Sequence, residues 1–126
     1  MDIGNTNITV GAFNNDDLVA SWRLSTDPHC QMDEYALQIK MLLPMKGVSV
    51  ESIREAAICS VVPPLTTVFE EVCQLLFGVV PLVVGIGTKT GVDIMYDNPK
   101  DVGSDRVVDA AATYHLYGGP AVIVDF

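Results

Sequence analysis

The feature that most constrains the fold is a change of hydrophobic pattern along the chain. Up to Leu24, apolar residues such as Ile8 and Val10 alternate with polar or small ones, which is typical of strands with one buried face. From Ala56 to Val62 and from Val80 to Val84 the sequence is almost continuously apolar, which favours strands covered on both faces. The first 24 residues therefore predict three antiparallel strands, and the later runs predict strands of a parallel arrangement.

Helices are predicted between these later strands. Apolar positions interleaved with charges predict a helix from Met32 to Met45, and Pro63-Pro64 opens a second helix that ends at Gly78. A third helix is predicted from Gly103 to Tyr117. The remaining predictions are a helical turn at 50–54, a loop at 85–101 and a last strand at 121–125. This order predicts an α/β fold, a ribonuclease H-like mixed sheet covered on both faces.

Charge and composition exclude several functional classes. A net charge of −9 over 126 residues opposes binding to nucleic acid and to anionic membranes. The apolar runs are shorter than the roughly 18 residues that cross a bilayer, so no membrane span is expected. The three cysteines suggest buried thiols in a reducing cytosol rather than disulfides or a zinc site. With no signal peptide in view, a cytoplasmic location is expected.

The polar turn Asp2-Ile3-Gly4-Asn5-Thr6-Asn7 is the first candidate site. Its backbone N–H groups and its Asn and Thr side chains could face phosphate oxygens. A carboxylate beside a phosphate is repulsive unless a divalent cation lies between them, so a phosphate-binding role for this turn implies magnesium near Asp2, held through water. The alternative is an ordinary hairpin turn rich in Gly and Asn.

The segment Gly103-Ser104-Asp105-Arg106 is the second candidate site. Asp101 or Ser104 is the expected N-cap of the helix. Asp105 would then lie in the first turn, where the positive helix end favours its charged form and makes it a weak base. A weak base suits phosphoryl transfer, which mainly needs an oriented hydroxyl group. The alternative is that Asp105 only complements the helix dipole and Arg106 pairs with Asp109.

Two further residues could take part. Tyr96 precedes the turn Asp97-Asn98-Pro99 and could wall a small-molecule pocket, although an ordinary half-buried tyrosine is the simpler interpretation. Asp125 follows the apolar residues 122–124, and a carboxylate at the end of a buried strand needs a cation, a ligand or a helix end as its partner.

Together these motifs resemble type III pantothenate kinase, of the superfamily of acetate and sugar kinases, heat-shock ATPases and actin. The Asp2 turn is similar to the first phosphate motif of that family, and Asp125-Phe126 is similar to the opening of its second. The pattern Tyr-x-x-Pro-x-x-x-Gly-x-Asp-Arg is matched by Tyr96, Pro99, Gly103, Asp105 and Arg106. Ser104 stands where the family often has alanine.

The resemblance implies a role for each candidate residue. ATP phosphates and their Mg²⁺ would be bound by Asp2, Gly4, Asn5, Thr6 and Asn7. Pantothenate would be bound by Tyr96, Gly103, Ser104, Asp105 and Arg106. Asp105 would be the catalytic base, Arg106 would anchor the substrate carboxylate, and Asp125 would help to hold a monovalent cation, K⁺ or NH₄⁺.

The implied activity is ATP-dependent phosphorylation of pantothenate, the first step of coenzyme A biosynthesis, by a cytosolic homodimer. The chain is expected to be the N-terminal half of such an enzyme and inactive alone, with a ribonuclease H-like domain at 1–118 and the first strand of a second, truncated domain at 119–126. An accessory transcription regulator or a catalytically silent interaction module of the same fold is the alternative.

Overall fold

The computed structural model describes residues 1–85 and 87–124, which contain a five-stranded mixed sheet of order β3-β2-β1-β4-β5. Its strands are β1 (Asp2–Ile3), β2 (Asn7–Asn14), β3 (Asp17–Ser25), β4 (Ala57–Ser60) and β5 (Leu82–Val83). β1 runs antiparallel to β2 and parallel to β4, and β4 and β5 are parallel. The predicted antiparallel meander and the change to parallel pairing are both confirmed.

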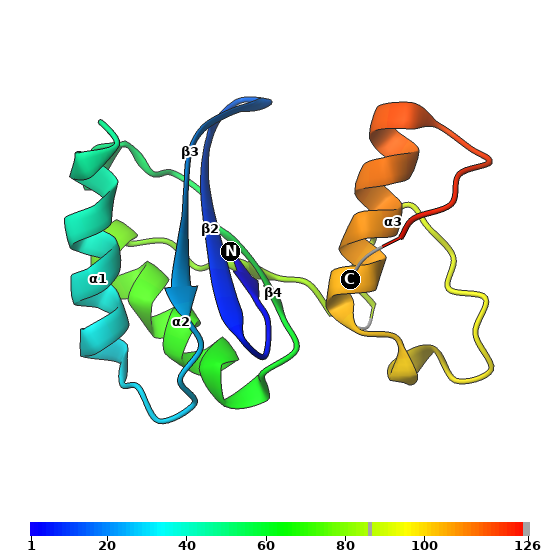
Figure 1. Cartoon of the computed structure of the whole chain (residues 1–126), viewed down its shortest axis with the longest axis horizontal. Coiled ribbons are helices and arrows are strands. Elements are labelled where there is room, and N and C mark those ends of the chain that lie inside the picture. Colours follow the sequence, from blue (N-terminus) through cyan, green and yellow to red (C-terminus); the bar gives the residue numbers. More distant parts are fainter. Residues whose placement is uncertain (86, 125–126) are drawn as a thin grey trace.

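The helices follow the predicted order. They are α1 (Met32–Met45), the 3₁₀ turn η1 (Val50–Ser52), α2 (Pro63–Phe77), the 3₁₀ turn η2 (Pro99–Asp101) and α3 (Ser104–Tyr117). Figure 1 shows α1 and α2 together on one side of the sheet, with α3 on the other side. The fold is thus the mixed α/β arrangement expected for an actin-like ATPase.

The hydrophobic core lies between the sheet and the pair α1 and α2. Inward residues of β2 and β3 alternate with exposed ones, so that Ile8 and Leu24 are buried against the helices. The rings of Tyr35 on α1 and Phe69 on α2 are packed with centroids 4.8 Å apart. The Tyr35 hydroxyl accepts a hydrogen bond from the N–H of Asp27 at 3.0 Å, which ties the β3–α1 connection to this core.

Two expectations differ from the structure. The sheet was expected to be covered on both faces, but α3 contains no buried residue and meets the sheet chiefly at β4 (Figure 1). The predicted strand at 121–125 is wrong for residues 121–124, which form no strand and are exposed, with Val122 at 91 %. An apolar run becomes a strand only beside a partner strand, and none pairs with these residues in the described part of the chain. Asp125 and Phe126 lie outside the described residues.

Candidate active site

The Asp2–Asn7 turn is a tight connection between β1 and β2, held by main-chain hydrogen bonds. The N–H of Gly4 donates to the carbonyl of Asn7 at 3.0 Å. A Cβ atom at Gly4 would lie only 3.1 Å from that same oxygen, so the turn needs glycine there. Asn5, Thr6 and Asn7 are exposed, which leaves their side chains open to a ligand.

Thr26, just after β3, braces this turn from outside. Its hydroxyl donates to the carbonyl of Gly4 at 2.7 Å, and its N–H donates to the carbonyl of Thr6 at 3.1 Å. The two bonds fix main-chain atoms on both sides of Asn5, so the turn is preorganised before any ligand arrives.

The N-terminus of α3 is joined to the end of β4 through Ser104. The Ser104 hydroxyl donates to the carbonyl of Ser60 at 3.0 Å and accepts from the N–H of Ser60 at 3.3 Å. The Cys59 thiol also donates a hydrogen bond to the Ser104 hydroxyl oxygen, at 3.3 Å. Because of these contacts Ser104 does not cap its own helix; the N-cap is Gly103, without a side-chain cap bond. The predicted N-caps, Asp101 and Ser104, were therefore wrong.

Asp105 lies in the first turn of α3, as predicted, and its side chain folds back over the start of the helix. Its Oδ1 accepts a hydrogen bond from the N–H of Arg106 at 2.8 Å. A Cβ atom built on Gly103 would collide with this oxygen. Glycine at 103 is therefore a packing requirement of the Asp105 conformation.

Cys59 brings the two candidate motifs together. It stands opposite Asp2 in the parallel pairing of β1 with β4, and it contacts Ser104, the neighbour of Asp105. Burial raises the pKa of the Cys59 thiol; the hydrogen bond to Ser104 opposes this shift, while the negative charges of Asp2 and Asp105 add to it. Asp2 and the start of α3 therefore both lie close to Cys59.

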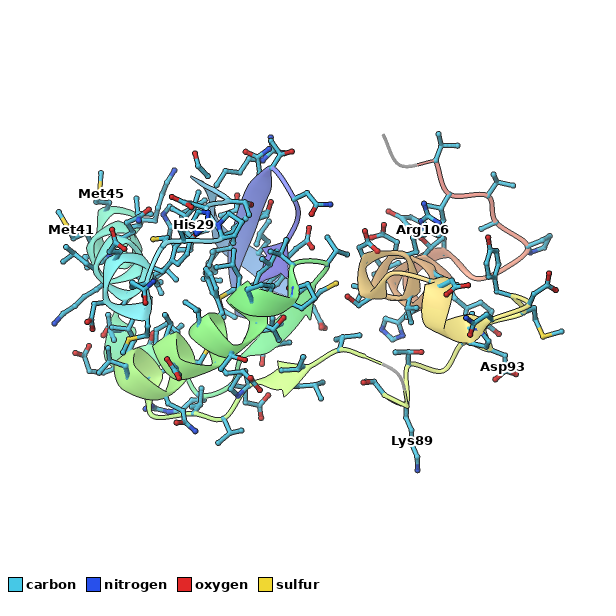
Figure 2. All side chains as sticks on the ribbon, turned by 90° about the horizontal axis from the view of Figure 1, so that it is seen from below. His29, Met41, Met45, Lys89, Asp93 and Arg106 are labelled. Carbon is cyan, nitrogen blue, oxygen red and sulfur yellow. The ribbon has the colours of Figure 1, made fainter. Side chains whose placement is uncertain are left out.

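The other predicted site residues are less enclosed. Tyr96 lies in the loop before η2 with 60 % of its surface exposed, and Arg106 is exposed on α3. Figure 2 shows Arg106 in the part of the molecule formed by α3 and the loop that carries Asp93. Both side chains are therefore largely open to solvent. Asp125, the predicted ligand of a monovalent cation, lies outside the described residues.

Sequence patterns gave no hint of three residues that shape this site: Thr26, Ser60 and Cys59. Thr26 bonds main-chain atoms of the distant Asp2 turn, and Ser60 presents its own main-chain N–H and carbonyl to the Ser104 hydroxyl. Neither of these long-range contacts has a local sequence signature. Serine before an apolar helix is an ordinary turn signal, and the Ser60 side chain does bond Val62 locally, with Oγ donating to its carbonyl and accepting from its N–H at 3.2 Å.

The described residues contain no group of three or more His, Cys, Asp and Glu side chains that could hold a metal by themselves. The donors at the Asp2 turn are oxygens and amides on exposed side chains. Such a set fits a hydrated Mg²⁺ that arrives with nucleotide phosphates, rather than a cation caged by protein ligands alone.

The mixed sheet of order β3-β2-β1-β4-β5, with its three helices, places the chain in the actin-like ATPase fold class. The model of the family "Type III pantothenate kinase" matches residues 1–126, and the chain belongs to this family. The match covers the N-terminal region of the family, as the motifs predicted. In the described part of the chain, no helix is both long and apolar enough to span a membrane.

Proposed function

We propose that the full-length protein transfers the γ-phosphoryl group of ATP to the primary hydroxyl of pantothenate. The observation that supports this proposal is that the Asp2 turn and the start of α3, which carries Asp105, both lie close to Cys59. Family membership supports a kinase with these two substrates.

The proposed roles follow from which side chains are exposed and from how the main chain that carries them is held. Asn5, Thr6 and Asn7 bind the phosphates, since their side chains are open and their main chain is braced by Thr26. Mg²⁺ bound with ATP through water near Asp2 supplies the positive charge that offsets repulsion between carboxylate and phosphate. Asp105 orients the pantothenate hydroxyl and accepts its proton late in the reaction.

Substrate recognition is assigned to the face of α3 and the loop before it. Arg106 is proposed to anchor the pantothenate carboxylate, since guanidinium and carboxylate groups match in a bidentate geometry. Gly103, Ser104 and Tyr96 complete this side. The Ser104 hydroxyl already donates a hydrogen bond to the carbonyl of Ser60. Ser104 therefore contributes to pantothenate binding by its position at the start of α3.

The proposal also covers the monovalent cation, the activity of residues 1–126 alone and the oligomeric state. Asp125 helps to hold K⁺ or NH₄⁺, residues 1–126 are inactive alone, and two copies pair as a homodimer. Exposed apolar side chains on α3, Leu116 and Tyr117, offer a surface for such pairing. Light scattering of the full-length protein tests the dimer. A role as a transcription regulator is not favoured, because the net charge of −9 opposes contact with DNA.

The direct test is phosphorylation of pantothenate by the full-length protein with ATP and Mg²⁺, in the presence and absence of K⁺. We expect 4'-phosphopantothenate to form, with faster turnover when K⁺ is present. If the protein phosphorylates neither pantothenate nor a truncated analogue of it, the proposal is contradicted.

A further inference from the structure

Tyr35 of α1 places a buried hydroxyl group against the segment that follows β3. The side chain is only 1 % exposed, and its ring is packed against the fully buried ring of Phe69 on α2. Dense packing of this kind leaves the ring little freedom to move. Burial raises the pKa of the Tyr35 hydroxyl, so the group keeps its proton and can donate as well as accept a hydrogen bond.

This hydroxyl holds the main chain on both sides of Thr26. Its oxygen accepts a hydrogen bond from the N–H of Asp27 at 3.0 Å. Its one proton can be donated to the carbonyl of Ser25 or to that of Asp27, each at 3.3 Å. The carbonyl of Ser25 and the N–H of Asp27 belong to the two planar peptide groups that flank Thr26. One buried hydroxyl therefore restrains the main chain that sets the direction of the Thr26 side chain.

Thr26 passes this restraint on to the turn between β1 and β2. Its N–H donates to the carbonyl of Thr6 at 3.1 Å, and its hydroxyl donates to the carbonyl of Gly4 at 2.7 Å. When Tyr35 donates to the carbonyl of Ser25, the peptide group before Thr26 is hydrogen-bonded at both ends. Hydrogen bonds that are linked through one peptide group polarise and strengthen each other.

The sheet register keeps all these groups at the same end of the sheet. Asn7 pairs with Ser25, so the start of β2 and the end of β3 lie side by side where the turn is (Figure 1). Thr26 is half-buried there, whereas the side chains of Asn5, Thr6 and Asn7 are exposed. The turn is thus held through its main chain while its side chains stay open to a ligand.

We propose that Tyr35 is a positioning residue for the phosphates of ATP: its hydroxyl holds Thr26, and Thr26 holds residues 4–6 in the conformation that binds them. This role rests on the proposed binding of ATP by the turn. Tyr35 is buried and acts only through the main chain around Thr26. Loss of its hydroxyl should therefore weaken ATP binding and leave pantothenate binding, assigned to α3 and the loop before it, unchanged.

Tyr35→Phe removes the hydroxyl and keeps the ring in the core. The first measurement is amide hydrogen exchange, followed by NMR in the full-length protein without nucleotide, at the N–H groups of Gly4 and Thr26. Both groups donate main-chain hydrogen bonds at the turn. We expect both amides to exchange about fivefold faster in the variant. A Gly4 amide that exchanges as in the wild type would overturn the proposal.

The second measurement is steady-state kinetics of the full-length enzyme with each substrate varied in turn. In Tyr35→Phe, KM for ATP should rise about fivefold while KM for pantothenate stays the same. Ile39→Val is the matched control, because Ile39 is buried one turn further along α1 and loss of one carbon there costs similar stability. It should change neither KM. An equal rise in KM for ATP in Ile39→Val would overturn the proposal, since general destabilisation would then explain both variants.

The double variant Tyr35→Phe/Thr26→Val tests whether the hydroxyl acts through Thr26. If it does, KM for ATP should rise about fivefold, as in Thr26→Val alone, rather than by the roughly 25-fold of two independent effects. Independent effects would overturn the proposal. If the wild-type enzyme does not use ATP, the proposed function fails, and exchange of the Gly4 amide still decides whether Tyr35 holds the turn.

Discussion

The hydroxyl of Ser104 donates a hydrogen bond of 3.0 Å to the carbonyl of Ser60, which lies 44 residues earlier in the chain. α3 has no buried residue, so this bond and the contact with Cys59 are prominent among its attachments to the sheet. The bond fixes the first turn of α3, and with it Asp105, against the strand that is paired with β1.

Replacing Ser104 by alanine should loosen this attachment. Loss of a hydrogen bond of this kind costs about 1 kcal/mol, so amides of α3 should exchange with solvent about fivefold faster. Hydrogen exchange measured by mass spectrometry on α3 peptides provides the readout. Ser21→Ala, at an exposed position of β3, is the matched control and should change nothing. Unchanged exchange in α3 of Ser104→Ala would show that the bond does not hold the helix.

Gly103→Ala should impair catalysis while the protein stays folded. The new Cβ atom would collide with Asp105 Oδ1 and force the carboxylate away from its present position. Since small displacements of a catalytic group are costly, kcat of the full-length enzyme should fall by at least about tenfold. A Cβ atom at Gly85 meets nothing within 4 Å, so Gly85→Ala is the control. Wild-type kcat in Gly103→Ala would refute the packing argument.

Thr26→Val should weaken ATP binding selectively. Valine keeps the shape of threonine but cannot donate to the carbonyl of Gly4, so the Asp2 turn loses one of its braces. A loss of about 1 kcal/mol corresponds to a rise of about fivefold in KM for ATP, with KM for pantothenate unchanged. Steady-state kinetics with each substrate varied in turn measures both values. An equal rise in both would mean that Thr26 supports the fold in general rather than this turn.

The stability of the chain should fall in alkali because of Cys73. This thiol is fully buried, and burial raises its pKa from 9.0 to about 11. The unfolded state therefore ionises at a lower pH than the folded state. The resulting stabilisation is complete below pH 9.0 and is lost as pH rises toward about 11.

Urea unfolding of wild type and Cys73→Ala across this range measures the effect. Alanine leaves a small cavity, so the variant is less stable at pH 8. The difference in unfolding free energy should narrow by about 2 to 3 kcal/mol as pH rises from about 9 to about 11, since each pKa unit is worth about 1.4 kcal/mol. If the difference in unfolding free energy stays constant with pH, the pKa of the Cys73 thiol is the same in the folded and unfolded states.

The local elements could be predicted from sequence because their signals are local. Met32–Met45 shows the alternation of apolar and charged positions of an amphipathic helix, and Pro63-Pro64 marks a helix start by its missing N–H groups. The turn at Asp2 and the placement of Asp105 in the first turn of α3 were predicted in the same way. These features depend on residues within a few positions of each other.

The connections between elements could not be predicted in this way. Ser104 was expected to be available as an N-cap, but a strand 44 residues away uses its hydroxyl instead. The apolar residues 121–124 have the composition of a strand, yet strand formation depends on a neighbour that no local pattern supplies. The placement of Asp2 and of Ser104 beside Cys59 likewise depends on the pairing of β1 with β4 and on the docking of α3, which no local pattern displays.

The role of Asp105 as the catalytic base is tested most directly by Asp105→Asn in the full-length enzyme. Asparagine keeps the shape of aspartate and can still accept from the N–H of Arg106, but it cannot take up a proton. We expect kcat for pantothenate phosphorylation to fall by about 10²-fold or more, while calorimetry shows unchanged pantothenate affinity. Turnover close to that of the wild type would contradict the assignment.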